Sequence, residues 1–250
     1  ANPPTSWLSL ALEIKKARRR GMKLIVIDPR KTGFAGRADL WLSPRPGSDG
    51  ALALAMARVA LEEGLADQGF LSRFSNAPFL VRGDTGRFLR AAELEVGAAV
   101  DGFLAWDLDE GAAVAVGSAR DSARLASSGS FTVQTLAGPV LCCPAHSHYA
   151  DACRSMSLAR AEALTGVPAP QIRSAARLMF EAGPAGFFTW TGLCQQSDAT
   201  QTTRALCLLY ALTGQLDAPG GNVLFPRPTL DDVSGLELLP AGMLEETLGR

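Results

Sequence analysis

The chain has 250 residues, of which 47% are hydrophobic and 20% are charged, the profile of a globular protein with a core. Its net charge of -1 at pH 7 argues against nucleic acid or a membrane surface as a partner. No apolar run approaches the roughly 20 residues that a membrane-spanning helix requires. The five cysteines show no C-x-x-C spacing, which argues against a zinc site, an iron–sulfur cluster or a disulfide framework within the chain.

The first 74 residues carry helical and strand-like patterns in turn. Residues 5–20 predict a helix capped by Thr5 or Ser6 and ended by Gly21. The aliphatic run "MKLIVID" (22–28) indicates a strand that is buried on both faces, as in parallel sheets. A shorter strand, "ADLWLSP" (38–44), is predicted next. The Ala-rich and Leu-rich segment 49–64 predicts a strong helix, and residues 67–74 predict a short one.

The pattern loosens between residues 75 and 149, where short strand-like pieces are separated by Gly, Asp and Ser. Two helices are predicted in "SLARAEALTGVP" and "APQIRSAARLMFEAG", then a buried strand in "PAGFFTWTG" (184–192) and a helix in "DATQTTRALCLLYALTG". The sum predicts an α/β domain over residues 1–222, a Rossmann-like parallel sheet flanked by helices, with an irregular insertion at about 75–150. Because residues 223–250 turn irregular and no initiating Met is present, we expect a piece that is incomplete at both ends.

Three predicted segments end in polar or Gly-rich sequence: Asp28-Pro29-Arg30, Pro46-Gly47-Ser48-Asp49 and Thr191–Gln195. Ligands of open α/β sheets bind beyond the carboxyl ends of the strands. An aspartate at such a place can accept hydrogen bonds from ribose hydroxyls or from a purine N–H pair, and Gly47 lets a ligand approach the main chain. The alternatives are ordinary: Asp49 as a helix N-cap, and Asp28 as a turn residue before proline.

Other site patterns are weak. No G-x-G-x-x-G follows a strand and no G-x-x-x-x-G-K-[ST] occurs, so the usual phosphate loops are absent from the sequence. His146 and His148, near Cys142 and Cys143, make a metal site conceivable, but exposed loop histidines are the more ordinary interpretation. No pattern singles out a nucleophile or a general base. The residues by themselves therefore indicate a binding domain.

Taken together, these strings resemble the molybdopterin oxidoreductases of the dimethyl sulfoxide reductase family. The resemblance rests on "NPPTSW" before a helix, on "LIVIDPRKTGFAGRADLWLSPRPGSDGALALAMARV", on "LTGVPAPQIRSAARL", on "TGLCQQSDATQTTRALCLLYALTG" and on "APGGN". It covers most of residues 1–224, and the order and spacing of five motifs make it specific. "FSNAPFLVRGDTGRFLR" and "FLAWD" look like the branch that contains phenylacetyl-CoA oxidoreductases and acetylene hydratase.

The resemblance implies molybdenum or tungsten held by two molybdopterin guanine dinucleotides, with residues 1–222 binding one guanosine. It implies that Asn2 and Pro3 face the cofactor, that Asp28, Pro29, Arg30 and Thr32 line the guanosine, that Gly47, Ser48 and Asp49 reach the guanine or ribose, and that Thr191 and Gln195 lie nearer the pterin. A guanine edge offers two adjacent donors, which suit one carboxylate. Cys194 and Gln196 depart from the family pattern beside Gln195.

The resemblance also implies that the metal ligand and the cysteines of a [4Fe-4S] cluster lie upstream of residue 1, and that this segment alone is inactive. Residues 223–250 would begin the return into a neighbouring domain. The expected partners are the remaining domains of the same polypeptide and an iron–sulfur electron-transfer subunit. The alternatives are a metal-free structural or electron-transfer homologue, like the large subunit of complex I, and a non-redox hydratase. The compartment is open, with prokaryotic cytoplasm and periplasm both compatible.

Overall fold

The computed structural model describes residues 3–95, 102–117 and 124–226, and the single residues 235, 238 and 243. Asn2, a predicted cofactor contact, therefore lies outside the described residues. The predicted return into a neighbouring domain, residues 223–250, also lies largely outside them. The helices are α1 (Pro3–Ser6), α2 (Leu8–Arg19), α3 (Asp49–Glu62), α4 (Gln68–Phe74), α5 (Ala145–Ser155), α6 (Leu158–Thr165), α7 (Ala169–Glu181), α8 (Thr191–Cys194) and α9 (Ala199–Ala211). The strands are β1 (Ile25–Ile27), β2 (Leu40–Leu42), β3 (Leu80–Arg82), β4 (Leu104–Asp107), β5 (Ala112–Ala115), β6 (Phe131–Thr135) and β7 (Gly138–Pro144).

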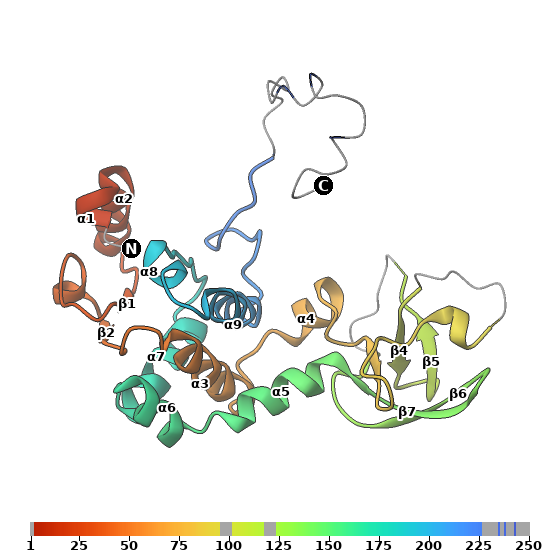
Figure 1. Ribbon diagram of the computed structural model, residues 1–250. Helices are drawn as coiled ribbons and strands as arrows, with labels where there is room; N and C mark the ends of the chain where they lie inside the picture. Colours follow the sequence, from red (N-terminus) through yellow and green to blue (C-terminus); the bar gives the residue numbers. More distant parts are fainter. Residues whose placement is uncertain are drawn as a thin grey trace.

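Helix α3 is the centre of the main core and packs against α9, α7, α6 and α5 (Figure 1). Its buried residues are mostly small, which lets the neighbouring helices approach closely: Leu52, Ala53, Ala55, Met56, Ala57, Val59 and Ala60. The predicted helices at 49–64, 67–74, 157–168, 169–183 and 198–214 are confirmed as α3, α4, α6, α7 and α9. The N-terminal helix differs, because α2 begins at Leu8 after Trp7, so the predicted cap at Thr5 or Ser6 is wrong.

Strands β1 and β2 form a parallel pair in which Ile25 lies opposite Leu40 and Ile27 opposite Leu42. Leu42 is fully buried, but the residues of β1 are only half-buried and Ile27 is 38% exposed. The prediction of a strand buried on both faces is therefore wrong for this chain. The physical reason is that the described parallel sheet has two strands, and one neighbouring strand does not cover both faces and the outer edge of β1.

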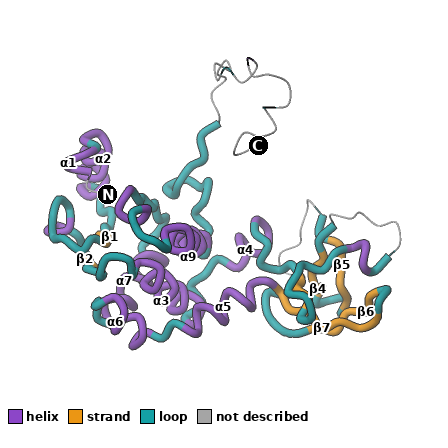
Figure 2. The backbone as a smooth tube through the Cα atoms, in the orientation of Figure 1, coloured by secondary structure: helices purple, strands orange, loops and turns teal. Residues whose placement is uncertain are grey.

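The insertion at 75–150 forms a separate group of antiparallel strands, which Figure 2 shows in orange at the right. One sheet has the order β3-β7-β6, and β4 pairs with β5 in a hairpin. A small core joins them, centred on Leu80, Leu89, Leu104 and Val133. The strand-like pieces predicted here are confirmed as β3, β4, β5 and β6, while β7 and the helix α5 that follows it escaped prediction.

The strand predicted at 184–192 is wrong. Residues 183–190 have no regular structure, and α8 begins at Thr191. The side chain of Asn222 takes the place of a neighbouring strand: its Oδ1 accepts from the Phe187 N–H at 2.6 Å, and its Nδ2 donates to the Phe187 carbonyl at 2.7 Å. Because the side-chain amide of Asn222 pairs with the backbone of Phe187 alone, it holds this segment in place without the repeated hydrogen bonds of a β-sheet.

The structure confirms the α/β class, with one parallel and two antiparallel sheets among the described residues. A Rossmann-like sheet stays a prediction, because β1 and β2 are the one pair of described strands that run parallel, besides an isolated parallel bridge between Leu216 and Asn222. In the parts of the chain that the structure describes, helices fall short of the length and apolarity that crossing a membrane requires.

Candidate functional site

The loop before α3 is fixed by Arg45. Its Nη1 donates to the carbonyls of Ala163 at 2.6 Å and Leu164 at 3.1 Å, and its backbone N–H donates to the Thr165 carbonyl at 2.8 Å. These carbonyls belong to the C-terminal turn of α6, where helix acceptors lack intrahelical donors and a positive charge is favoured. Arg45 therefore anchors the segment that carries Gly47, Ser48 and Asp49 onto the end of α6.

Gly47 and Asp49 lie near the residues that lead into α9. Gly47 has φ +84°, and a Cβ at this position would lie 3.2 Å from Oε1 of Gln196. A Cβ on Gly50 would lie 3.1 Å from the Thr202 hydroxyl, so α3 and α9 approach closely at their first turns. The tertiary structure thus brings the predicted loop 47–49 together with residues 196–202.

Asp49 is the first residue of α3 and does not cap it. The N-cap is Ser48, whose hydroxyl donates to the Arg45 carbonyl at 2.6 Å instead of accepting from the helix. The Asp49 carboxylate is half-buried, and its hydrogen bonding within the described residues is limited to its own backbone N–H. Burial raises the pKa of Asp49, and the charge of Asp198 raises it further.

Asp28 and its neighbours lie beside the end of β2. The Asp28 carboxylate accepts from the Arg30 N–H at 2.8 Å, which is the turn geometry that an aspartate before proline favours. The Pro29 carbonyl accepts from the Ser43 hydroxyl at 3.1 Å, and the Thr32 N–H donates to the Arg30 carbonyl at 2.8 Å. The two strand ends meet as predicted, but the hydrogen bonds and ion pairs of the described residues do not link Asp28 with Asp49.

The remaining predicted residues lie around Trp7 and Trp190. Pro3 begins α1 and accepts from the Trp7 N–H at 2.9 Å, and the Trp7 ring lies 6.3 Å from the Trp190 ring. Thr191, the first residue of α8, and Gln195, at its C-terminal end, are both exposed. Figure 1 shows α8 between the N-terminal helices and α9. The turn at Pro3 and the start of α8 are therefore neighbours.

Sequence reasoning missed the partners of the loop, which are Arg45, Gln196, Asp198 and Thr202. Asp198 accepts from the Thr202 hydroxyl at 3.1 Å. Its place before a helix was visible in the sequence, but its position opposite Asp49 depends on how α3 and α9 pack. The role of Arg45 could not be predicted, because its hydrogen-bond acceptors are more than a hundred residues away in the sequence.

The histidine pair is placed on α5, so the loop interpretation is wrong. Nε2 of His148 lies 3.2 Å from Sγ of Cys143, and His146 is half-buried. Burial raises the pKa of the Cys143 thiol, and the charge of Asp151 adds to the effect. Among residues 3–95, 102–117 and 124–226, groups of three or more metal-ligating side chains are not found.

Comparison with known proteins identifies the family. The family model for molybdopterin oxidoreductase matches residues 1–226. The chain belongs to the molybdopterin oxidoreductase family. Membership implies a molybdopterin-type cofactor with a metal.

Two relatives match along most of the chain. The chain is 31% identical to a sulfite dehydrogenase subunit of Allochromatium vinosum over 88% of the chain and 26% of the relative. It is 30% identical to the dimethylsulfide dehydrogenase alpha subunit of Rhodovulum sulfidophilum over 88% of the chain and 25% of the relative. The chain thus spans about a quarter of the length of these relatives.

Acetylene hydratase is similar in both sequence and fold. Acetylene hydratase of Syntrophotalea acetylenica is 45% identical over 28% of the chain and 10% of the relative. The solved structure of acetylene hydratase from Pelobacter acetylenicus matches with a TM-score of 0.52 and 23% identity, covering 84% of this chain and 19% of the other. The similarity to this solved structure supports the fold described above for the chain.

Proposed function

We propose that this chain is part of the catalytic subunit of a molybdenum or tungsten enzyme and binds one guanosine of a bis-molybdopterin guanine dinucleotide cofactor. The observation that carries the proposal is the Asp49 carboxylate. It is half-buried at the close approach of α3 and α9, and its acceptor positions are unused within the described residues apart from its own N–H. Family membership supplies the class of ligand.

The residues present fit a guanosine. The N1–H and N2–H₂ groups of guanine are adjacent donors, and a carboxylate accepts from both. Gly47, without a side chain and with φ +84°, exposes main chain next to Asp49. In this proposal Ser48 and Asp49 hold the base or ribose, Asp28, Pro29, Arg30 and Thr32 line the nucleoside, and Asn2, Pro3, Thr191 and Gln195 lie toward the pterin.

The cofactor supplies, when bound, a metal for two-electron redox or oxygen-atom transfer. The residues of this chain bind and orient the nucleotide part, and none of them is proposed as a catalytic group. The metal ligand, a [4Fe-4S] cluster and the contacts to an iron–sulfur electron-transfer subunit would come from other parts of the protein. We expect the 250-residue segment alone to be inactive.

A second candidate function is a non-redox hydratase. The observation that favours it is the local identity of 45% to a protein named acetylene hydratase, together with the fold likeness to another of that name. The two candidates share the nucleotide site and differ in the chemistry of the metal. Full-length protein that hydrates acetylene without an electron acceptor would favour the hydratase, and reduction of a dye by an oxidisable substrate would favour the oxidoreductase.

The test of cofactor binding uses the full-length protein. We expect Asp49→Ala to lower both the molybdenum or tungsten content, measured by mass spectrometry, and the guanine released by acid hydrolysis. Asp151→Ala is the matched control, because Asp151 is an exposed aspartate on α5 outside the site. Unchanged metal and guanine in Asp49→Ala would contradict the assignment of Asp49. Wild-type protein without metal or guanine would contradict the proposed function and favour a metal-free homologue.

A further inference from the structure

Two tryptophans lie side by side at the surface, next to residues that the proposed function places toward the pterin. The ring centroids of Trp7 and Trp190 are 6.3 Å apart and the rings are tilted by 50°, so they do not stack on one another. Trp7 is 50% exposed and Trp190 is 59% exposed. Large aromatic rings that gather at a surface mark interaction sites, because burying such a ring removes much apolar area from water. The pair is therefore a candidate contact for a ligand.

The backbone of Trp7 is fixed from both sides, although its ring is exposed. The Trp7 N–H donates to the Pro3 carbonyl at 2.9 Å, and the Trp7 carbonyl accepts from the Ala11 N–H at 3.0 Å. Trp7 is the N-cap of α2, and Ala11 is the buried residue of that helix. The indole therefore projects from a helix start whose backbone hydrogen bonds are made.

The segment that carries Trp190 is also fixed from both sides. Three residues before it, the Phe187 ring stacks on Tyr210 at 5.8 Å, and the Asn222 side chain binds the Phe187 backbone. Three residues after it, the Leu193 N–H donates to the Trp190 carbonyl at 3.2 Å, and Leu193 packs against the main core. An exposed ring on a fixed backbone loses little conformational freedom when a ligand binds.

Helix α8 connects the tryptophan pair with the loop that carries Asp49 (Figure 1). Trp190 is the N-cap of α8, and Thr191, which the proposed function places toward the pterin, is its first residue. Gln196 lies just beyond the C-terminal end of α8, and a Cβ on Gly47 would lie 3.2 Å from its Oε1. At about 1.5 Å of rise per residue, the four residues of α8 span only about 6 Å. The pair and the loop therefore lie at opposite ends of a short helix, which suits a ligand with two flat groups.

We propose that Trp7 and Trp190 form an aromatic contact for the pterin of the cofactor, an inference that rests on the proposed function. A pterin is a flat heteroaromatic ring system, and aromatic side chains bind such rings by stacking. Offset and edge-on contacts between rings are both favourable, so the tilt between the two indoles is compatible with one bound ring. The tryptophans bind and orient the pterin in this proposal and have no part in the chemistry of the metal.

Tryptophan fluorescence of the full-length protein tests the proposal, because a heteroaromatic ring in contact with an indole quenches its emission. The protein is prepared with the cofactor and, from cells that cannot make molybdopterin, without it. We expect Trp7→Phe and Trp190→Phe each to remove at least about twofold more emission from the cofactor-free protein than from the loaded protein, because stacking quenches both indoles once the cofactor is bound.

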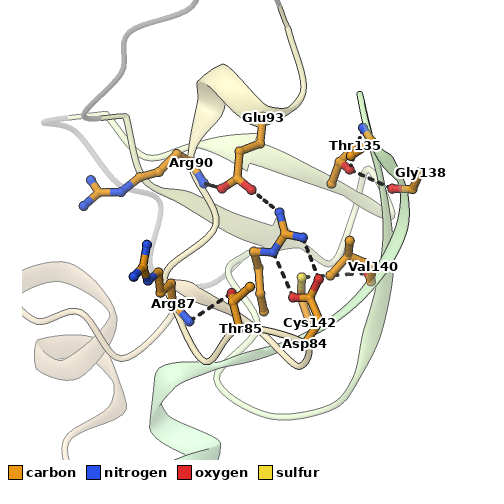
Figure 3. A network of polar contacts seen from close by, with 11 residues as sticks. Asp84, Thr85, Arg87, Arg90, Glu93, Thr135, Gly138, Val140 and Cys142 are labelled. Atoms are coloured by element: carbon orange, nitrogen blue, oxygen red, sulfur yellow. Dashed lines mark hydrogen bonds and ion pairs between the residues drawn. The ribbon is translucent and has the colours of Figure 1, made fainter.

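Trp106→Phe is the matched control, because Trp106 belongs to the insertion. Its ring stacks on Phe131 at 4.5 Å, beside the small core of the insertion. The insertion is also held by polar contacts among its own residues: the Arg82 guanidinium donates to both oxygens of Asp84, at 2.9 Å and 2.7 Å, and to Glu93 (Figure 3). Trp106→Phe should therefore remove the same emission from both forms of the protein.

The rate at which the cofactor is released gives an independent readout. Leucine at positions 7 and 190 keeps apolar bulk but removes the rings, so the double variant Trp7→Leu, Trp190→Leu should lose bound guanine at least about tenfold faster on dilution than the wild type. The double variant Trp7→Phe, Trp190→Phe should release it slowly, since phenylalanine still stacks. Both tryptophan rings are exposed, so these substitutions leave the core intact, which equal unfolding midpoints of the cofactor-free proteins will verify.

The possible failures are distinguishable. If the wild type holds metal and guanine, but either Phe substitution removes equal emission from both forms, the aromatic contact is overturned and the proposed function stands. Another part of the polypeptide would then be what covers the pair. Guanine release from the double Leu variant at the wild-type rate would overturn the contact as well. Wild-type protein without metal or guanine would contradict the proposed function, and this inference with it.

Discussion

Asp49, the first residue of α3, lies close enough to Asp198, the residue before α9, for the charge of Asp198 to raise the pKa of the Asp49 carboxyl. The two aspartates are held differently. Asp198 accepts from the Thr202 hydroxyl at 3.1 Å, whereas Asp49 is half-buried and bonds to its own N–H. Of the two, Asp49 is therefore the carboxylate that keeps acceptor positions for a ligand.

Asp49→Asn should raise the stability of the cofactor-free protein at neutral pH. Burial and the charge of Asp198 raise the pKa of Asp49, and together they outweigh the hydrogen bond from its own backbone N–H, which lowers it. A raised carboxyl pKa favours folding below the unfolded value of about 3.9, and this contribution is lost as pH rises through the folded pKa.

The gain from Asp49→Asn should stay below about 1 kcal/mol because the group is half-exposed. The free energy of unfolding of the full-length apoprotein is measured with urea at about pH 4 and at about pH 7. We expect Asp49→Asn to be more stable than the wild type at about pH 7 and close to it at about pH 4. A variant that is less stable than the wild type by the same amount at both values would contradict this account.

Gly47→Ala should destabilise the protein more than Gly64→Ala. Both glycines have positive φ, +84° and +68°, so each alanine meets backbone strain of about 1 kcal/mol. Only at Gly47 would the new Cβ also press on Gln196, at 3.2 Å, while nothing lies within 4 Å at Gly64. Denaturant unfolding of the two variants measures the difference. Adding Gln196→Ala to Gly47→Ala should abolish the excess cost, and persistence of that cost would place its origin elsewhere.

Asn222→Ala should release the segment that leads to α8. It removes both hydrogen bonds to the backbone of Phe187, at a combined cost of about 1–2 kcal/mol. Hydrogen exchange followed by mass spectrometry should show faster exchange over residues 186–190. Asn222→Asp keeps the acceptor but loses the donor, and should have a smaller effect. The exposed Asn76→Ala serves as control, and equal exchange in all variants would show that the segment is held by other contacts.

Asp107→Asn should lower the unfolding midpoint at neutral pH more than Asp109→Asn. Asp107 is 5% exposed; burial would raise its pKa, but hydrogen bonds from the Glu110 and Asp109 N–H groups and the charge of Arg124 at 2.8 Å lower it on balance. Asp109 also pairs with Arg124, at 3.1 Å, but its side chain is 71% exposed.

A lowered carboxyl pKa gives stability above the unfolded value of about 3.9, and this stability is lost as pH falls through the folded pKa. The difference between Asp107→Asn and the wild type should therefore shrink in acid. Thermal unfolding as a function of pH measures it, and a difference that is constant with pH would show that the charge of Asp107 is not its source.

The sequence by itself determined helices α3, α4, α6, α7 and α9, the α/β class and the family. Helix periodicity, Gly stops and Ala-rich composition are local, so α3, α6, α7 and α9 were predictable within a few residues. Motif order predicted the family, which the match over residues 1–226 confirms. The aliphatic runs at β1 and at 184–192 were less reliable, because strand formation depends on a neighbouring strand that the run itself does not specify.

Only the tertiary structure decided which residues face one another. Asp28 and Asp49 looked equivalent in sequence, yet Asp28 closes a turn with the Arg30 N–H while Asp49 is free of any capping role. The place of Asp198 opposite Asp49 and the anchoring of Arg45 on α6 both depend on packing between segments that are far apart in the sequence. Residue types and local pattern determine helices and turns, whereas the distances that give a carboxylate or an arginine its chemistry are set by long-range contacts.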